Sequence, residues 1–190
     1  MPTPPCEELD RTLRTNRLEL RPLHISHVDA LWPYVSDPEL PKLMTWEAHR
    51  DRSETVQFVE GVVAARQAGT GYVWAFHRQE VLCGLVGLHE VVRTVRAWRQ
   101  DRAELGYWCG AEHRGRGYIT EAAREAIRFG FQDLGLHKIT VCCATENHPS
   151  RRVIEKLGFR FVGEQRDHFH RFGRWWNHLL FELVVEDWRP

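Results

Sequence analysis

Residues 102–134 place a strand-like run, a glycine loop and an amphipathic helix in direct succession. The run RAELGYWC (102–109) is suited to a strand, and the loop after it contains the tetrapeptide RGRG (114–117). From residue 117 onward, apolar side chains recur on one helical face and charged side chains on the other. A strand that passes directly into an amphipathic helix is typical of folds in which helices pack on a β-sheet, so this segment predicts an α/β protein.

The rest of the chain continues this pattern. The predicted strands cover residues 17–23, 71–76, 81–92, 102–109, 137–145, 159–166 and 175–188, and the predicted helices begin near Ser26, Asp51, Gly117 and Pro149. The resulting order, β-α-α-β-β-β-α-β-α-β-β, predicts a mixed sheet. We expect a single domain over residues 16–190, behind a loose, Pro-rich arm at residues 1–15.

Three local features refine the prediction. Ser26 with Asp29 has the pattern of a helix cap, and Pro33 should keep the helix that follows short or kinked. The charged stretch 93–101 is predicted to be a loop. The apolar strand 137–145 is predicted to be buried on both faces.

Charge and composition argue against several functional classes. Lys plus Arg and Asp plus Glu number 26 each, so the formal net charge is zero, and we expect no stable nucleic-acid binding. The chain has no apolar leader and no run near the roughly 20 residues of a membrane span, so we expect a cytoplasmic protein without a membrane partner. The five cysteines form no C-x-x-C pair, and His168 with His170 lacks a third ligand, so no metal site is expected.

The glycine loop predicts an anion site where the helix begins. A helix N-terminus presents unpaired backbone N–H groups and the positive end of the helix dipole. Gly115 and Gly117 permit a close approach and a positive φ, while Arg114 and Arg116 add charge. The loop lacks the G-K-[ST] ending of a P-loop and does not fit the dinucleotide-binding fingerprint. The residues alone leave a solvated Gly-rich turn as the alternative.

Three blocks of sequence together resemble one known family. They are GYWCGAEHRGRGYITEA (106–122), NHPSRRVIEKLGF (147–159) and GRWWNHLLFELVVEDW (173–188). They are similar to the GNAT N-acetyltransferases, and within these to the Rim-type branch, which acetylates ribosomal-protein N-termini and related amines. The resemblance runs over nearly the whole chain. It implies a GNAT fold, an α/β fold with a mixed, mostly antiparallel seven-stranded sheet with a splayed centre, flanked by about four helices.

The resemblance implies acetyl-CoA as the acetyl donor and cosubstrate. The backbone around Gly115 and Gly117 should bind the CoA pyrophosphate, and the end of strand 102–109 should hold pantetheine by backbone hydrogen bonds. Glu112 departs from the family, which usually has Gln or Arg there. The expected cofactor-binding residues are Tyr107, Trp108, Cys109, Arg114, Gly115, Arg116, Gly117, Tyr118, Ile119, Thr120, Asn147 and Ser150.

Direct transfer to an amine needs a base for the amine and an acid for the leaving thiolate. In some relatives a Tyr supplies the acid, but Ile154 stands at that position here, so Ser150 is the candidate that the Rim-type resemblance offers. Its alternative role is a local hydrogen bond at a helix start. Because the family uses a ternary complex, Cys109 is not expected to be a nucleophile.

Two residues are candidates on the acceptor side. Glu104 lies on the strand that should hold the acetyl group and is the candidate base, or else the cross-strand partner of an arginine. His168, in the expected connection between the last two strands, could act in catalysis or contact the acceptor, and a surface loop is its alternative. The acceptor pocket is expected from the first two helices and the 165–175 loop, with walls chosen from Trp46, Trp175 and Trp176.

The favoured function is an N-acetyltransferase that moves acetyl from acetyl-CoA to a primary amine in a ternary complex. The acceptor could be a protein N-terminus, including that of a ribosomal protein, or a small-molecule amine. The alternative is a CoA-binding or RNA-contacting module of the same fold without transfer, since Trp98 lies within an arginine-rich stretch, residues 93–102. The sequence is compatible with a homodimer and does not identify the amine.

Overall fold

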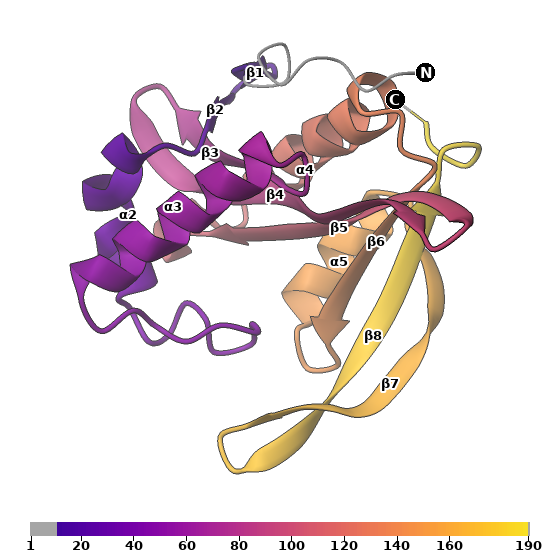
Figure 1. Cartoon of the computed structure of the whole chain (residues 1–190). Helices are drawn as coiled ribbons and strands as arrows, with labels where there is room; N and C mark the ends of the chain where they lie inside the picture. Colours follow the sequence, from indigo (N-terminus) through magenta and orange to yellow (C-terminus); the bar gives the residue numbers. More distant parts are fainter. Residues whose placement is uncertain (1–10, 190) are drawn as a thin grey trace.

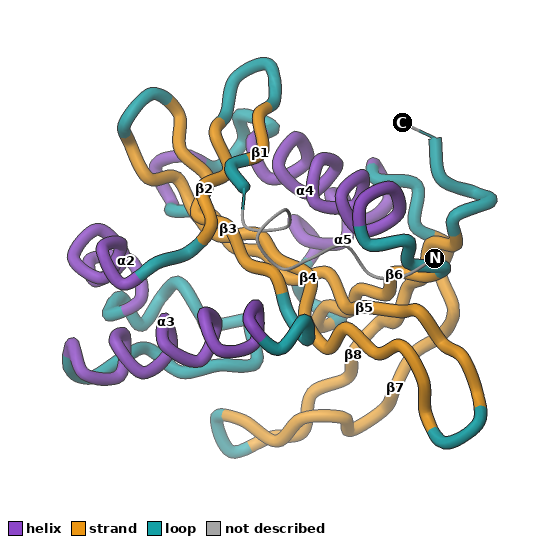
Figure 2. The backbone as a smooth tube through the Cα atoms, turned by 45° about the horizontal axis from the view of Figure 1, so that its top comes forward, coloured by secondary structure: helices purple, strands orange, loops and turns teal. Residues whose placement is uncertain are grey.

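The computed structural model describes residues 11–189 and shows helices packed on both faces of one mixed sheet (Figures 1 and 2). The strands are β1 Leu13–Arg14, β2 Glu19–Pro22, β3 Tyr72–Arg78, β4 Val81–Val95, β5 Trp98–Cys109, β6 Lys138–Ala144, β7 Arg160–Arg171 and β8 Arg174–Val184. The helices are α2 Val28–Val35, α3 Arg52–Gln67, α4 Tyr118–Arg128 and α5 His148–Lys156, with short helical turns η1 Ile25–His27, η2 Ala111–His113 and η3 Phe129–Asp133. The α/β class and the predicted order of elements are confirmed.

Within residues 11–189 the sheet has eight strands in the order β1-β2-β3-β4-β5-β6-β8-β7, rather than the seven expected. The additional strand is β1, in which Leu13 and Arg14 pair antiparallel with β2. This strand lies within the arm predicted to be loose through residue 15. Residues 1–10 of that arm lie outside the described part of the chain.

The centre of the sheet is splayed, as expected. β5 and β6 are its parallel pair, and they are matched only over Arg102–Glu104 and Lys138–Thr140. β5 stays paired with β4 as far as Cys109, and β6 stays paired with β8 as far as Ala144. The two halves of the sheet therefore separate beyond Glu104.

Two apolar clusters hold the helices on the sheet. One lies between the sheet and helices α4 and α5, and the other lies under α2 and α3. In the first, the ring of Phe129 meets that of Trp74 edge-on at 4.9 Å, and both are fully buried. Burying one such side chain contributes roughly 1.5–3 kcal/mol, so these clusters give β3, β4 and β5 a rigid base.

Several predicted helix ends are confirmed. The Asp51 carboxylate accepts a hydrogen bond from the Ser53 N–H at 2.7 Å and caps α3, and Gly69 follows that helix with φ +69°. Gly158 follows α5 with φ +83°. No helix within residues 11–189 is long and apolar enough to cross a membrane.

The cap expected from Ser26 and Asp29 is wrong. His24 caps η1 instead, because its imidazole accepts from the Ser26 N–H while the His27 imidazole accepts from the His24 N–H at 3.1 Å. An imidazole nitrogen can therefore take the place of the usual hydroxyl or carboxylate. Pro33 lies inside α2, which is only eight residues long, as expected of a short helix.

Three predictions about the strands need correction. The stretch 93–101 is not a loop, because β4 and β5 continue through it to a tight turn between Val95 and Trp98. Its charges are accommodated in part by the buried Asp101. β6 is buried on one face only, because its other face borders a cavity. His168 lies within β7 and not in a connecting loop.

Candidate functional site

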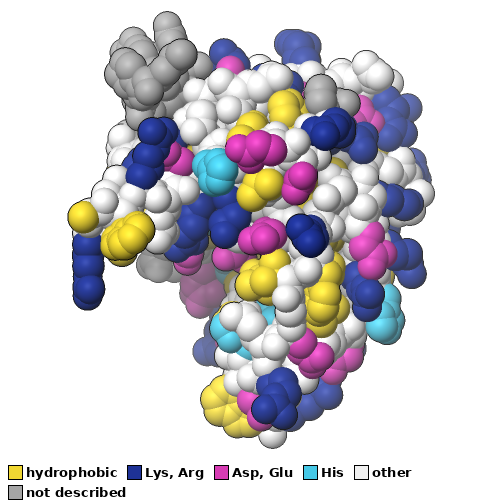
Figure 3. All heavy atoms as spheres, turned by 90° about the vertical axis from the view of Figure 1, so that its right-hand side faces the viewer, with side chains coloured by type: hydrophobic (Ala, Val, Ile, Leu, Met, Phe, Trp, Pro, Cys, Tyr) yellow, Lys and Arg dark blue, Asp and Glu magenta, His cyan; other side chains and the backbone are white. Residues whose placement is uncertain are grey.

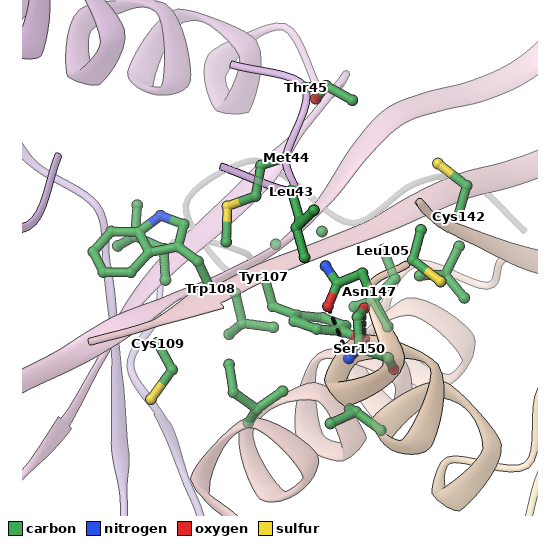
Figure 4. A pocket seen from close by; sticks show the side chains of 18 of the residues that line it. Leu43, Met44, Thr45, Leu105, Tyr107, Trp108, Cys109, Cys142, Asn147 and Ser150 are labelled. Carbon is green, nitrogen blue, oxygen red and sulfur yellow. Dashed lines mark hydrogen bonds between the residues drawn. The ribbon is translucent and has the colours of Figure 1, made fainter. Parts of the chain in front are cut away.

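A cavity of 1420 Å³ opens where β5 and β6 separate (Figure 4). The loop after α2, strands β4 to β8 and the N-terminal ends of α4 and α5 contribute to its wall. The lining includes Glu104, Tyr107, Trp108, Cys109, Arg114, Gly115, Gly117, Tyr118, Ile119, Thr120, Asn147, Ser150 and His168. The structure thus brings together every site residue predicted from the sequence except Arg116, which lies outside the lining.

The glycine loop ends in a left-handed residue that starts α4. Gly117 has φ +79° and precedes the helix, and Gly115 has φ +74°. Residues other than glycine rarely adopt this left-handed backbone conformation. The backbone N–H groups of Tyr118, Ile119 and Thr120 lie in the first turn, where an α-helix offers them no carbonyl partner. They are therefore able to bind an anion.

An N-terminal arginine, missed in the sequence, fixes this loop. Arg17 Nη1 donates to the Arg116 carbonyl at 3.1 Å, and its guanidinium meets the Glu121 carboxylate at 2.6 Å. The same guanidinium lies 5.0 Å from the centre of the Tyr118 ring. The carbonyl of Arg116 therefore anchors the loop, whereas its side chain is not brought to the cavity. No local pattern points to Arg17, because its partners lie about a hundred residues further along the chain.

Glu112, which departs from the family pattern, also has a structural partner. Its carboxylate accepts from the Tyr34 hydroxyl of α2 at 2.8 Å. Its own backbone N–H and the Tyr34 hydroxyl hold the pKa of Glu112 below its usual value. The Arg114 Nε donates to the Cys109 carbonyl at 3.4 Å, which draws its side chain toward the end of β5. The loop is thus tied to α2 on one side and to β5 on the other.

Asn147 and Ser150 lie at the start of α5, beside the separated strands (Figure 4). The Asn147 Oδ1 accepts from the Ser150 N–H at 3.2 Å and caps the helix. The Ser150 Oγ lies 3.0 Å from the Tyr107 hydroxyl, so the alternative expected for this serine, a purely local bond, does not describe its side chain. Burial raises the pKa of Tyr107 well above its usual range, so the phenol keeps its proton at neutral pH.

The thiols at the cavity are also protonated. Burial raises the pKa of Cys109 and of Cys142 to about 12, and that of Cys143 to about 11. A thiol in this state is a poor nucleophile, because the thiolate is the reactive form. The Cys142 thiol donates to Glu104 Oε1 at 3.2 Å. Within residues 11–189, Glu104 therefore has a thiol as its partner, not the arginine considered as an alternative.

The part of the cavity that is lined by β7 and β8 carries a cluster of rings. The ring of His168 lies 4.5 Å from that of Phe169 and 5.6 Å from that of His178, which belongs to β8. His178 is only 6% exposed, and its Nδ1 has no hydrogen-bond partner in the described chain. Burial and the nearby His168 lower its pKa. His178 was missed from the sequence, although its register opposite Ala144 places it on the cavity face of the sheet.

The tryptophan walls expected for this region are only partly found. Trp46 lines the cavity, with its ring 5.9 Å from that of His49. Trp175 and Trp176 do not line it. Trp175 is 58% exposed near the end of the β7–β8 hairpin, and the Trp176 ring lies 3.5 Å from the Arg174 guanidinium carbon. The hairpin is therefore an extended pair of strands and not the loop expected at 165–175.

Known proteins match this chain along most of its length. A family model described as an acetyltransferase (GNAT) domain matches residues 17–160. The uncharacterized N-acetyltransferase p20 of Bacillus licheniformis is 31% identical over 180 residues, which cover 93% of this chain and 98% of that protein. The ribosomal protein uS5-alanine N-acetyltransferase of Escherichia coli is 27% identical, over 94% of this chain and 93% of that protein.

A solved structure adds the comparison of folds. The ribosomal-protein acetyltransferase RimL in complex with coenzyme A superposes with a TM-score of 0.85, covering 93% of this chain and 99% of that chain. The two sequences are 18% identical, so this likeness concerns the fold. In both the sequence and the structural comparisons, the matching region includes the strands and helices that form the cavity.

Proposed function

The chain belongs to the acetyltransferase (GNAT) family, and we propose that it acetylates the N-terminal α-amine of a protein, with ribosomal proteins as the acceptor class. As a member of this family it uses acetyl-CoA as cosubstrate and transfers the acetyl group to an amine. The observation that carries the proposal is the continuous cavity from the glycine loop, through the separated strands, to the ring cluster at His168 and His178.

The residues at the donor end fit the chemistry of CoA. The N-terminus of α4, with Gly115 and Gly117, offers backbone N–H groups to the pyrophosphate, and Arg114 adds positive charge. Beyond Glu104 the facing edges of β5 and β6 are not paired with each other, so their backbone can bind the amide groups of pantetheine. Asn147 lies at this split and borders the same cavity.

The Ser150–Tyr107 pair is suited to protonate the leaving thiolate. Both hydroxyls are protonated at neutral pH, and the 3.0 Å contact allows one to supply the other. The protonated thiols of Cys109 and Cys142 favour direct attack by the amine over an acyl-enzyme route. Glu104, whose carboxylate borders the cavity, is the base candidate that the sequence suggested.

The acceptor end is open and mixed in chemistry, which suits the end of an extended chain. Loop residues 42–46 border the cavity, and so do His168, Phe169 and His178 of the β7–β8 hairpin. The unpartnered Nδ1 of His178 can exchange a hydrogen bond with a polar group of the acceptor. The choice of a ribosomal protein is supported by the Rim-type blocks and by the name of the E. coli relative.

No observation favours the alternative of an RNA-contacting module. Arg93 and Arg99 are each paired with Asp101, although Trp98 remains exposed. Figure 3 shows Lys and Arg side chains interspersed with Asp and Glu over the face it displays. A surface that binds nucleic-acid phosphates would instead carry mainly positive side chains. A catalytic role accounts for the cavity and its lining residues, which an RNA-contacting role would leave unexplained.

The test is release of CoA thiol from acetyl-CoA against a panel of amines. The panel contains peptides with ribosomal-protein N-termini, the same peptides already N-acetylated, spermidine, free amino acids and an aminoglycoside. The proposal predicts turnover with the free-amine peptides and none with the N-acetylated ones. Turnover confined to a small-molecule amine would replace the acceptor class. Failure of acetyl-CoA to bind at high micromolar concentration in calorimetry would contradict the donor assignment too.

A further inference from the structure

His89 of β4 lies opposite Glu104 of β5 in the antiparallel register. Residues directly opposite each other in neighbouring strands project to the same face of a sheet. Both side chains border the cavity, at the point where β5 is about to leave β6. A histidine therefore stands beside the carboxylate that faces the acceptor, although no sequence motif pointed to it.

Two glycines form a floor beneath the His89 ring. Gly87 and Gly106 are the next register pair toward the split on the same face of the sheet, since the pair between them, Leu88 and Leu105, projects to the other face. A Cβ built on Gly106 would lie 3.0 Å from both Cδ2 and Nε2 of His89, and a Cβ on Gly87 would lie 3.2 Å from Nε2. These contacts are tighter than ordinary van der Waals distances. The imidazole thus lies over the two glycines, and its Nε2 is the ring nitrogen nearer the separated strands.

The surroundings leave this imidazole able to accept a proton. Within the described chain, neither ring nitrogen of His89 has a hydrogen-bond partner. The His89 side chain is exposed toward the open cavity, yet desolvation by the surrounding chain lowers its pKa, against a smaller opposing effect of Glu90 on its own strand, so the ring is mostly neutral at pH 7. The ionisable groups that line this part of the cavity are Glu90 on β4, Arg102 and Glu104 on β5, and Lys138 and the Cys142 thiol on β6, the thiol being bonded to Glu104.

We propose that His89 is the catalytic base that takes the proton of the acceptor ammonium, while Glu104 holds that ammonium by its charge. The proposal deepens the proposed amine acetylation and rests on it. It divides between two residues the work that the sequence gave to Glu104 alone. His89, set on its glycine floor, is the residue that contacts the reacting nitrogen.

In the proposed step one C–S bond is exchanged for one N–C bond, and the ammonium nitrogen loses two protons. His89 Nε2 takes one proton from the ammonium, and the freed lone pair of the amine forms the new N–C bond. The C–S bond breaks with its electron pair on sulfur, which takes a proton from the Ser150–Tyr107 pair. The second proton leaves the nitrogen as the amide forms and restores that pair through water. The imidazolium returns its proton to solvent, so each turnover releases one proton net.

The first experiment compares pH profiles of kcat/KM for a peptide acceptor. The wild type should give a bell, with an acid limb from His89 below the ordinary value of 6.5 and a basic limb from the α-amine at about 8. His89→Gln should lower kcat/KM about 10- to 100-fold at pH 7. The acid limb should disappear, and kcat/KM should rise with pH through the pKa of the acceptor amine without a fall above it. Glu104→Gln should raise KM for the acceptor and keep the acid limb. His137→Gln, an exposed histidine outside the cavity lining, is the matched control and should match the wild type.

The second experiment uses the glycine floor. Among the described residues, the His89 ring atoms are the only ones within 4 Å of an added Cβ at Gly106, so Gly106→Ala should act through the imidazole. It should lower kcat/KM severalfold in the wild type and much less in the His89→Ala background. Equal losses in both backgrounds would mean that the methyl group obstructs a substrate directly. The two glycines would then not act by positioning the His89 ring.

A spectroscopic readout separates this proposal from the proposed function. With CoA present, a free-amine peptide should shift the ring NMR signals of His89, and the same peptide lacking its α-amine should not. If peptides are acetylated while His89→Gln keeps the wild-type pH profile and the ring signals do not respond, the base assignment is wrong and the function stands. If no amine in the panel is acetylated, the proposed function itself is wrong, and the amine panel shows this before His89 is tested.

Discussion

The hydroxyl of Tyr107 and the Oγ of Ser150 lie 3.0 Å apart, although 43 residues separate them in the sequence. The contact joins strand β5 to the first turn of α5, across the point where the sheet divides. It gives the candidate acid a second protonated hydroxyl, in a chain that has Ile154 at the position where some relatives carry a tyrosine.

Ser150→Ala should lower kcat about 10- to 100-fold, because it removes one of the two hydroxyls of the candidate acid pair, and should leave acetyl-CoA affinity within about twofold. Tyr107→Phe keeps the ring and should lower kcat by a similar factor. Since the two hydroxyls act together, the double variant should be little worse than either single one. Steady-state kinetics with calorimetry of acetyl-CoA binding measures both effects. Unchanged turnover in Ser150→Ala would remove the serine from the acid role.

Gly117→Val should weaken acetyl-CoA binding by at least about tenfold, because a β-branched residue resists the positive φ and would crowd the approach of the pyrophosphate. Gly135→Val is the matched control, since Gly135 also has a positive φ, is exposed and lies outside the cavity lining. It should lose comparable thermal stability and keep its affinity. Calorimetry of both variants decides the matter, and equal affinities would contradict the loop assignment.

Glu121→Gln should destabilise the fold by about 1 kcal/mol at pH 7, because the carboxylate accepts from the Thr15 hydroxyl and from Arg17. Burial tends to raise the pKa of Glu121, but these bonds outweigh it and the net pKa is lowered. A lowered folded-state pKa gives stability that is present above the ordinary glutamate pKa of about 4.3 and is lost as the pH falls through the folded value. The difference between variant and wild type should therefore shrink below about pH 4. Urea unfolding at pH 7 and pH 3.5 measures it.

The control for this prediction is Glu155→Gln. Glu155 forms an exposed pair with Arg151 on α5, with both side chains 51% exposed. Such pairs contribute little, so this variant should change the free energy of unfolding by less than about 0.5 kcal/mol. An equal loss in both variants would show that removal of a surface charge, and not the tie between the N-terminal segment and α4, sets the effect of Glu121→Gln.

Cys109→Ala should keep most of the wild-type turnover, since the thiol is protonated and the reaction does not need it. Wild-type protein mixed with acetyl-CoA in the absence of amine should show no added acetyl mass at Cys109, Cys142 or Cys143 after peptide mapping. Stoichiometric acetylation of one of these cysteines, discharged on adding amine, would overturn direct transfer.

Features encoded locally could be predicted from the sequence. The spacing of apolar residues and glycines gave the order of elements, the start of α4 at Gly117 and the end of α5 before Gly158. The cavity lining also contains most of the residues singled out for the cofactor, because they lie on two short blocks that the fold brings to one split.

Contacts between distant segments could not be predicted. Arg17 with Glu121, Tyr107 with Ser150, and the glycine floor under His89 depend on how elements pack, and the separate segments carry no sign of their partners. Residues 93–101 were misjudged because charge was taken as a sign of a loop. In a projecting hairpin, backbone pairing holds the strands while the charged side chains point outward or pair across them.

The three-residue pairing of β5 with β6 means that the sheet is held as two leaves with a short common hinge. If the pantetheine of acetyl-CoA binds between these leaves as proposed, its amide groups would supply the hydrogen bonds that the two strands do not form with each other. Part of the free energy of donor binding would then hold the two leaves together, and release of CoA would remove that link.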